Sequence, residues 1–211
     1  MKKTLVLAAS AAFIMACNSH SDHSNQQSTV DDHGEHAANK IDTNAITETM
    51  TQMMHDMHAV KSTGNNDIDF ASMMLEHHKG AVEMSEIEQE KGVDSDLRNF
   101  AKKVIDDQTV EINFMKKFIT ESPKEPSGNS AEFQKALRHS MMAMMGDSIP
   151  VYNNIDKDFA AQMIPHHQSA VDMAQAYLQF GKESSLRKLC ENIIASQTKE
   201  INWLKEWLSK K

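Results

Sequence analysis

Cysteine, positive charge and strand-like patterning are scarce in this chain of 211 residues, and each shortage argues against a class of function. With only two cysteines, neither a disulfide framework nor a cysteine-rich zinc site is expected, and Cys190 falls on a helical apolar stripe that favours burial over ligation. The net charge of −8 argues against a nucleic-acid partner, because such proteins usually present a basic face. No nucleophile with a recognisable base, phosphate loop or dinucleotide fingerprint occurs. Soluble partners and cations remain the favoured ligands.

The first residues have the pattern of a bacterial export signal. Lys2 and Lys3 supply the charged start, and residues 5–15 form an apolar stretch too short to span a bilayer. The stretch ends in Ile-Met-Ala-Cys, which resembles a lipobox, so residues 1–17 are predicted to be a lipoprotein signal with Cys17 lipidated. The alternative is an ordinary cleaved signal with an incidental cysteine. The prediction places the protein in the cell envelope, periplasmic or outer-membrane associated, with a lipid anchor as its only membrane contact.

Residues 18–43 are polar and contain almost no large apolar side chains, which favours a flexible tether. The tether is rich in histidine, at positions His20, His23, His33 and His36. Such a tract can bind divalent metal weakly, or it can serve only as a solvated spacer.

Beyond the tether the sequence contains an internal repeat. The pattern Asp-Phe-Ala-x-x-Met-x-x-His-His-x-x-Ala-Val-x-Met begins at Asp69 and again at Asp158, an offset of 89 residues. A methionine cluster precedes each copy. We therefore expect a first helical repeat over 44–122 and a second over 130–211.

Helical periodicity runs through both repeats, without strand-like alternation or a hairpin signal. Helices are predicted near 44–61, 68–91, 95–121, 131–146, 157–180 and 184–209. Gly92 and Gly181 are expected to end helices in the left-handed region, with Asp94 and Ser184 as the next N-caps. The fold class is therefore all-α: the two repeats pack as one four-helix bundle, with Met-rich helices alongside.

Two histidine pairs are the first candidate ligands. On a helical wheel His77 and His166 lie within an apolar arc and should face the core, whereas His78 and His167 lie toward its edge and should be more accessible, hence better ligands. The core histidines either bind metal or make internal hydrogen bonds, and the sequence leaves both open. The predicted hydrogen-bond partners are Gln108 or Glu111 for His77, and Gln197 or Glu200 for His166.

Methionine is unusually common, with sixteen residues against ten leucines. Clustered thioethers beside imidazoles select Cu(I), for which Ag(I) is a mimic, but methionine also makes adaptable cores and partner-binding surfaces. Candidate ligands in the first predicted helix are Met50, Met53, Met54, Met57, His55 and His58. Those beside the histidine pairs are Met73, Met74, Met84, Met163 and Met173. The second cluster adds Met141, Met142 and Met145.

The two blocks, Phe-x-x-x-Met-[Ile/Leu]-x-His-His-x-x-Ala-Val-x-Met followed by Gln-x-x-Glu-Ile, resemble the domain-of-unknown-function 305 family over residues 44–209. The resemblance implies a ferritin-like helical fold and, through the CopM-like members, copper binding outside the cytoplasm linked to copper resistance. The first repeat departs from the pattern, because Glu76 replaces the proline found at Pro165, so its helix is expected to be straighter.

The leading hypothesis is a non-enzymatic lipoprotein that binds copper for sequestration, resistance or transfer, with a copper-handling envelope protein as a further partner. One alternative is a ferritin-like di-iron oxidase, although the Glu-x-x-His motif of that class is missing from the chain. The other is a metal-independent envelope interaction module.

Overall fold

The computed structural model describes residues 45–123, 125–146 and 149–211, and the described residues form helices and no strand. The elements are α1 (Ala45–Ala59), α2 (Asn66–Lys91), α3 (Ser95–Glu121), α4 (Ser130–Ser140), the 3-10 helix η1 (Met141–Met144), α5 (Ile155–Phe180) and α6 (Ser184–Ser209). The predicted all-α, ferritin-like bundle is confirmed. The predicted signal, Cys17 and the tether lie outside the described residues.

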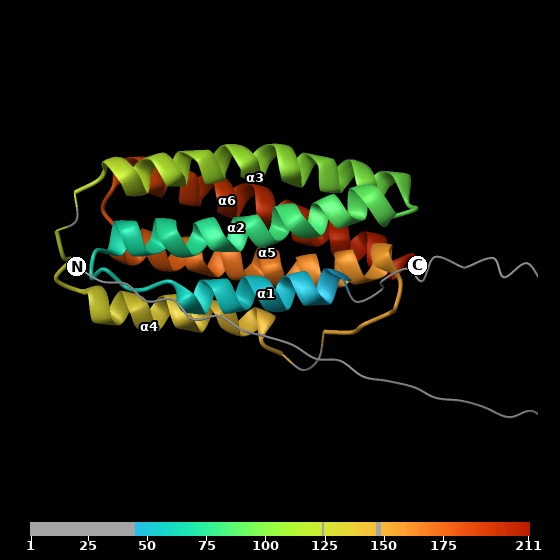
Figure 1. The fold of residues 1–211 in the computed structure, drawn as a ribbon, viewed down its shortest axis with the longest axis horizontal. Helices are drawn as coiled ribbons and strands as arrows, with labels where there is room; N and C mark the ends of the chain where they lie inside the picture. The colour runs from blue at the N-terminus through green and yellow to red at the C-terminus, as the bar shows by residue number, and fades with distance from the viewer. Residues whose placement is uncertain (1–44, 124, 147–148) are drawn as a thin grey trace, which may run out of the picture. The chain divides into compact units, whose positions relative to one another are not determined.

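The long helices α2, α3, α5 and α6 form the bundle (Figure 1). Helix α2 packs on α3, α5 packs on α6, and contact between α2 and α5 joins the two hairpins. Helix α1 packs on α2 and α5, and α4 and η1 pack on α5, on the side away from α3 and α6 (Figure 1). The Met-rich segments therefore flank a bundle built from both repeats, as predicted.

Both central helices begin two residues earlier than predicted because an asparagine caps each of them. The side chain of Asn65 accepts hydrogen bonds from the backbone N–H groups of Asp67 and Ile68, and that of Asn154 accepts from Lys157 N–H. These bonds satisfy N–H groups that a helix start leaves without partners. The same position in each repeat thus starts the helix that carries the histidine pair.

The turns after these helices differ from the prediction. Gly92 and Gly181 have φ of −68° and −83°, so neither is left-handed. Glycine is needed there for close approach, because a Cβ on Gly92 would overlap the carboxyl group of Glu88, and one on Gly181 would overlap the ring of Tyr177.

Two further local predictions have different outcomes. Asp94 caps α3 as predicted, whereas α6 is capped by Glu183, whose side chain accepts from Ser185 N–H, so the assignment of Ser184 was wrong. The helix predicted to reach residue 146 ends as α-helix at Ser140 and continues as η1.

Helices α2 and α5 are buried on several faces, because each has neighbours on more than one side. Helix α5 runs as one helix through Pro165.

Cys190 on α6 is fully buried, and burial raises the pKa of its thiol, which agrees with a packing residue rather than a ligand.

Candidate metal centre

The two histidine pairs lie inside the bundle, and all four side chains are completely buried. The prediction that His78 and His167 are accessible was therefore wrong. Glu111 on α3 lies against His78, and Glu200 on α6 lies against His167, so the third helix of each repeat covers the edge that a helical wheel leaves open.

The inner histidines of the two repeats meet each other. The ring centroids of His77 and His166 are 3.7 Å apart, and His166 Nε2 lies 3.0 Å from the backbone oxygen of His77. A carbonyl oxygen only accepts hydrogen bonds, so His166 Nε2 carries the proton and donates it. The neutral His166 ring therefore presents an unprotonated Nδ1.

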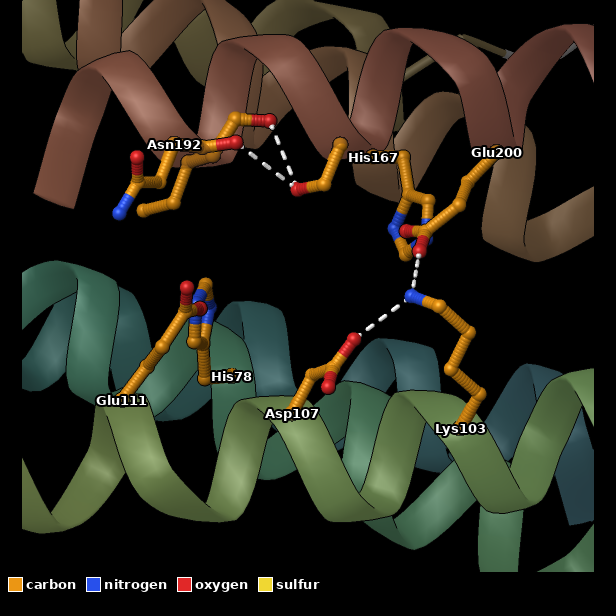
Figure 2. Close-up of polar contacts among 9 residues, drawn as sticks. His78, Lys103, Asp107, Glu111, His167, Asn192 and Glu200 are labelled. Carbon is orange, nitrogen blue, oxygen red and sulfur yellow. Dashed lines mark hydrogen bonds and ion pairs between the residues drawn. The ribbon is translucent and has the colours of Figure 1, made fainter.

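The outer histidines contact carboxylates (Figure 2). His78 Nε2 donates to Glu111 Oε2 at 2.7 Å. His167 Nε2 lies 3.0 Å from Glu200 Oε2, but not in the orientation of a hydrogen bond. The sequence analysis named Glu111 and Glu200 as possible partners of His77 and His166. In the structure each contacts the next histidine instead, His78 or His167.

Several buried polar atoms in this centre have no hydrogen-bond partner among the described residues. They are both ring nitrogens of His77 and of His167, Nδ1 of His78 and His166, and the side-chain oxygens of Gln108 and Gln197. Buried polar groups in native proteins are nearly always paired with protein, water or an ion. Each neutral imidazole in this centre keeps one nitrogen lone pair, so these rings and the two amide oxygens could together accept a cation.

The inner imidazoles are held in their neutral form. Burial lowers the pKa of His77 and His166 well below the usual value, and the neighbouring histidines lower it further. A neutral imidazole retains the lone pair that a metal requires, so these rings need not lose a proton before binding.

The hydrogen bonds also orient the rings as metal ligands. A metal-bound histidine usually donates its other ring N–H to a carboxylate or backbone carbonyl, which fixes the ring and its tautomer. His78 does so to Glu111, and His166 does so to the His77 carbonyl, and in both rings Nδ1 is left without a partner.

In the part of the chain that the structure describes, no three histidine, cysteine, aspartate or glutamate side chains are grouped so that they could hold a metal ion. A complete site built on these histidines therefore needs donors of another type. Methionines are available in the same core: Met74 lies four residues before His78, and Met163 lies four residues before His167. The predicted ligands Met73, Met84 and Met173 are buried in this cluster as well.

The candidate ligands of α1 do not share one face. Met50, Met53 and Met57 are buried and Met54 is half-buried, whereas the side chains of His55 and His58 are exposed. His58 Nδ1 lies 2.7 Å from the backbone oxygen of Met54. The expected mixed surface of thioether and imidazole is therefore divided between the core and solvent.

The second methionine cluster is divided in the same way. Met141 is buried in η1, while Met142 and Met145 are 60% and 61% exposed. The change from α-helix to 3-10 geometry after Ser140 explains the difference, because side chains no longer recur with helical spacing.

The sequence analysis did not identify Lys103, a charged residue beside the histidine centre. Lys103 Nζ lies 2.8 Å from Glu200 Oε1 and 2.6 Å from Asp107 Oδ2, a bridge between α3 and α6 (Figure 2). Burial opposes ionisation of Glu200, but its contacts with His167 and Lys103 outweigh burial and lower its pKa to about 2. A comparison of the repeats would have singled out this lysine, because Asn192 stands at its equivalent position.

Several solved structures share the fold of this chain. The chain is 33% identical to CopM in the Cu(I)-bound form, with a TM-score of 0.53 over 68% of this chain and 96% of that one. It is 31% identical to CopM in an Ag-bound form, with a TM-score of 0.52 and the same coverage. A fragment from Deinococcus radiodurans with a domain of unknown function (DUF305), 22% identical, has the same fold, with a TM-score of 0.53 over 69% of this chain and 97% of the fragment.

No curated protein matches the chain. The sequence profile of one family matches residues 13–119 and again residues 67–208, in agreement with the internal duplication. The chain therefore belongs to the DUF305 family, domain of unknown function 305.

Proposed function

We propose that this protein binds copper without transforming it, as Cu(I) held by imidazole nitrogens and methionine sulfurs within the bundle. One observation carries the proposal: His78 and His166 are buried, each has one ring nitrogen bonded to an oxygen, and each has Nδ1 without a partner. This is the form in which histidine binds a metal. The carboxylate and the carbonyl then act by orienting the rings.

The ligand types favour Cu(I) over harder ions. Thioether and imidazole together select Cu(I), whereas Mg²⁺ and Ca²⁺ prefer oxygen ligands. Met74 and Met163 are fully buried one helical turn from the outer histidines, in an interior where water does not compete for the metal. The solved CopM structures with Cu(I), Cu(II) and Ag support the same choice by similarity.

The cellular role follows from the sequence. An export signal with a lipidated Cys17 would place the bundle in the cell envelope, where it would sequester copper for resistance or transfer it to a copper-handling partner. No helix among the described residues is long and apolar enough to cross a membrane. The proposed membrane attachment is the lipid alone.

Anaerobic titration of the full chain with Cu(I), in competition with a coloured Cu(I) chelator, tests the proposal. The Met74→Leu, Met163→Leu pair keeps apolar volume and removes two sulfurs, and the His78→Gln, His166→Gln pair removes the two imidazoles on which the proposal rests. Each pair is expected to weaken binding by about tenfold or more. Far-UV circular dichroism of the metal-free variants checks that the bundle remains folded.

A matched control removes two exposed histidines of α1 through His55→Gln and His58→Gln. This variant is expected to bind as the unaltered chain does. The proposal is wrong if the unaltered chain does not compete with the chelator. The core location is wrong if the folded core variants retain full affinity and the α1 variant loses it.

A further inference from the structure

A cleft of about 500 Å³ separates α3 from α6 above the histidine centre. Its polar lining includes Asp107, Gln108 and Glu111 from α3, and Gln197 and Glu200 from α6. Figure 2 shows Lys103, Asp107 and Glu111 of α3 on one side of this space, and Asn192 and Glu200 of α6 on the other.

The cleft carboxylates connect solvent with the buried imidazoles. Glu111 and Glu200 line the cleft and are partly exposed, and each also contacts a fully buried ring, His78 for Glu111 and His167 for Glu200. A cation bound to either carboxylate would therefore lie one side chain away from the centre.

Two buried amides give the cleft a second feature that points to a ligand. Gln108 and Gln197 are each only 3% exposed, they line the cleft, and their side-chain oxygens have no partner. An unpaired buried carbonyl oxygen is costly unless a donor or a cation reaches it. Three carboxylates line this space, and Lys103 is paired with two of them, Asp107 and Glu200. The third, Glu111, has no lysine partner among the described residues, so the charge near it favours a cation.

The two glutamates of the cleft differ in their ammonium partners. At one end the ammonium group of Lys103 lies 2.8 Å from Glu200. At the other end, near Glu111, the equivalent of Lys103 in the second repeat is the neutral Asn192, which also lines the cleft (Figure 2). The repeat symmetry is therefore broken. Lys103 pairs with Glu200, whereas no lysine among the described residues pairs with Glu111, because the other lysine of the lining, Lys188, pairs with Glu191.

We propose that this cleft is a docking site for the incoming metal cation, and that the metal enters at the Glu111 end because Lys103 occupies the Glu200 end. Carboxylate and amide oxygens hold a soft cation weakly, so it moves on to the nitrogen and sulfur donors beneath. That the metal ends at the histidine and methionine donors rests on the proposed function, whereas the path by which it enters rests on the structure of the cleft.

Stopped-flow mixing of the full chain with aqueous Ag(I), followed by tryptophan fluorescence, measures the rate of entry, and the metal retained after gel filtration measures the capacity. Asn192→Lys places an ammonium group at the open end and is expected to slow uptake by about tenfold, the lower range of electrostatic steering effects. Lys103→Asn is expected to speed uptake. Neither variant should change the amount of silver retained.

Matched substitutions outside the cleft lining control for net charge. Asn202→Lys on α6 and Lys102→Asn on α3 alter exposed residues, the latter paired with Asp106. Both are expected to take up silver at the unaltered rate. Equal rates for Asn192→Lys and the unaltered chain at unchanged capacity would overturn the entry route. Failure of the unaltered chain to retain silver would overturn the metal-binding function itself.

Discussion

Replacing Glu88 with glutamine should abolish a large pH dependence of stability. Glu88 is fully buried near the end of α2, and no hydrogen-bond donor among the described residues reaches its carboxyl oxygens. Burial, and then the adjacent Asp156 carboxylate, raise the pKa of Glu88 from 4.5 to about 9. Asp156 itself accepts hydrogen bonds from the backbone N–H groups of Val93 and Asp94, at 2.9 Å each, and so fixes the turn between α2 and α3.

The sign of the effect follows from proton binding. Between about pH 4.5 and pH 9 the folded chain keeps the Glu88 proton and the unfolded chain has lost it, so stability falls as pH rises. Each pH unit in this window costs about 1.4 kcal/mol. From pH 5 to pH 8 this one carboxyl group therefore removes about 4 kcal/mol of stability, which the Glu88→Gln variant should retain.

Urea unfolding of the metal-free chain at pH 5 and pH 8 measures the difference between Glu88→Gln and the unaltered protein. Titration of other groups cancels in this difference. Tyr177 provides the control, because it occupies the equivalent position in the second repeat and its hydroxyl donates to Asp67. Tyr177→Phe should cost about 1–3 kcal/mol at both pH values, since it removes a hydrogen bond and no titrating group in this range. Parallel pH curves for Glu88→Gln and the unaltered chain would refute the reasoning.

Three further outcomes are expected. In the Glu88→Gln background, the metal-free protein should lose about 2 kcal/mol between pH 6.5 and pH 5.5, because His77 and His166 stay neutral when folded and take up protons only on unfolding. A urea-unfolding free energy that does not change over this range would contradict this. Gly80→Ala should destabilise the bundle by about 1–3 kcal/mol, because the new Cβ would lie 2.5 Å from Met53 Cγ and displace α1, and an unchanged thermal midpoint would be inconsistent with that packing. Pro165→Ala should stabilise α5 by about 1–3 kcal/mol by restoring a helical N–H donor, which a rise in the urea midpoint would verify.

Periodicity in the sequence was sufficient for the helices and for the bundle. The predicted bounds 95–121 and 184–209 agree with α3 and α6, because each of these helices has one apolar stripe and one solvent face. Prediction was poorer for the starts of α2 and α5, where Asn65 and Asn154 extend the helices by capping them.

The errors at the metal centre have one physical cause. A helical wheel describes a helix with a single buried side, but α2 and α5 contact several helices each. His78 and His167 lie at the edge of the apolar arc and are nevertheless buried, because α3 and α6 extend Glu111 and Glu200 over them. The sequence identified all of these residues, yet their pairing depends on the angle between neighbouring helices, which periodicity does not contain.

The two repeats have the same helices, and the positions at which their sequences differ give the two halves of the bundle different properties. The paired glutamines and histidines are the same in both repeats, so each half contributes an equivalent set of donors to the centre. Lys103 against Asn192 changes the charge at the two ends of the cleft, and Glu88 against Tyr177 makes one of two equivalent turns sensitive to pH. Because neither difference lies within the histidine pairs, the proposed metal affinity can be equal in both halves while the proposed entry route and the stability are set separately. Exchanging Lys103 and Asn192 should therefore move the entry point to the Glu200 end and leave the number of bound ions unchanged.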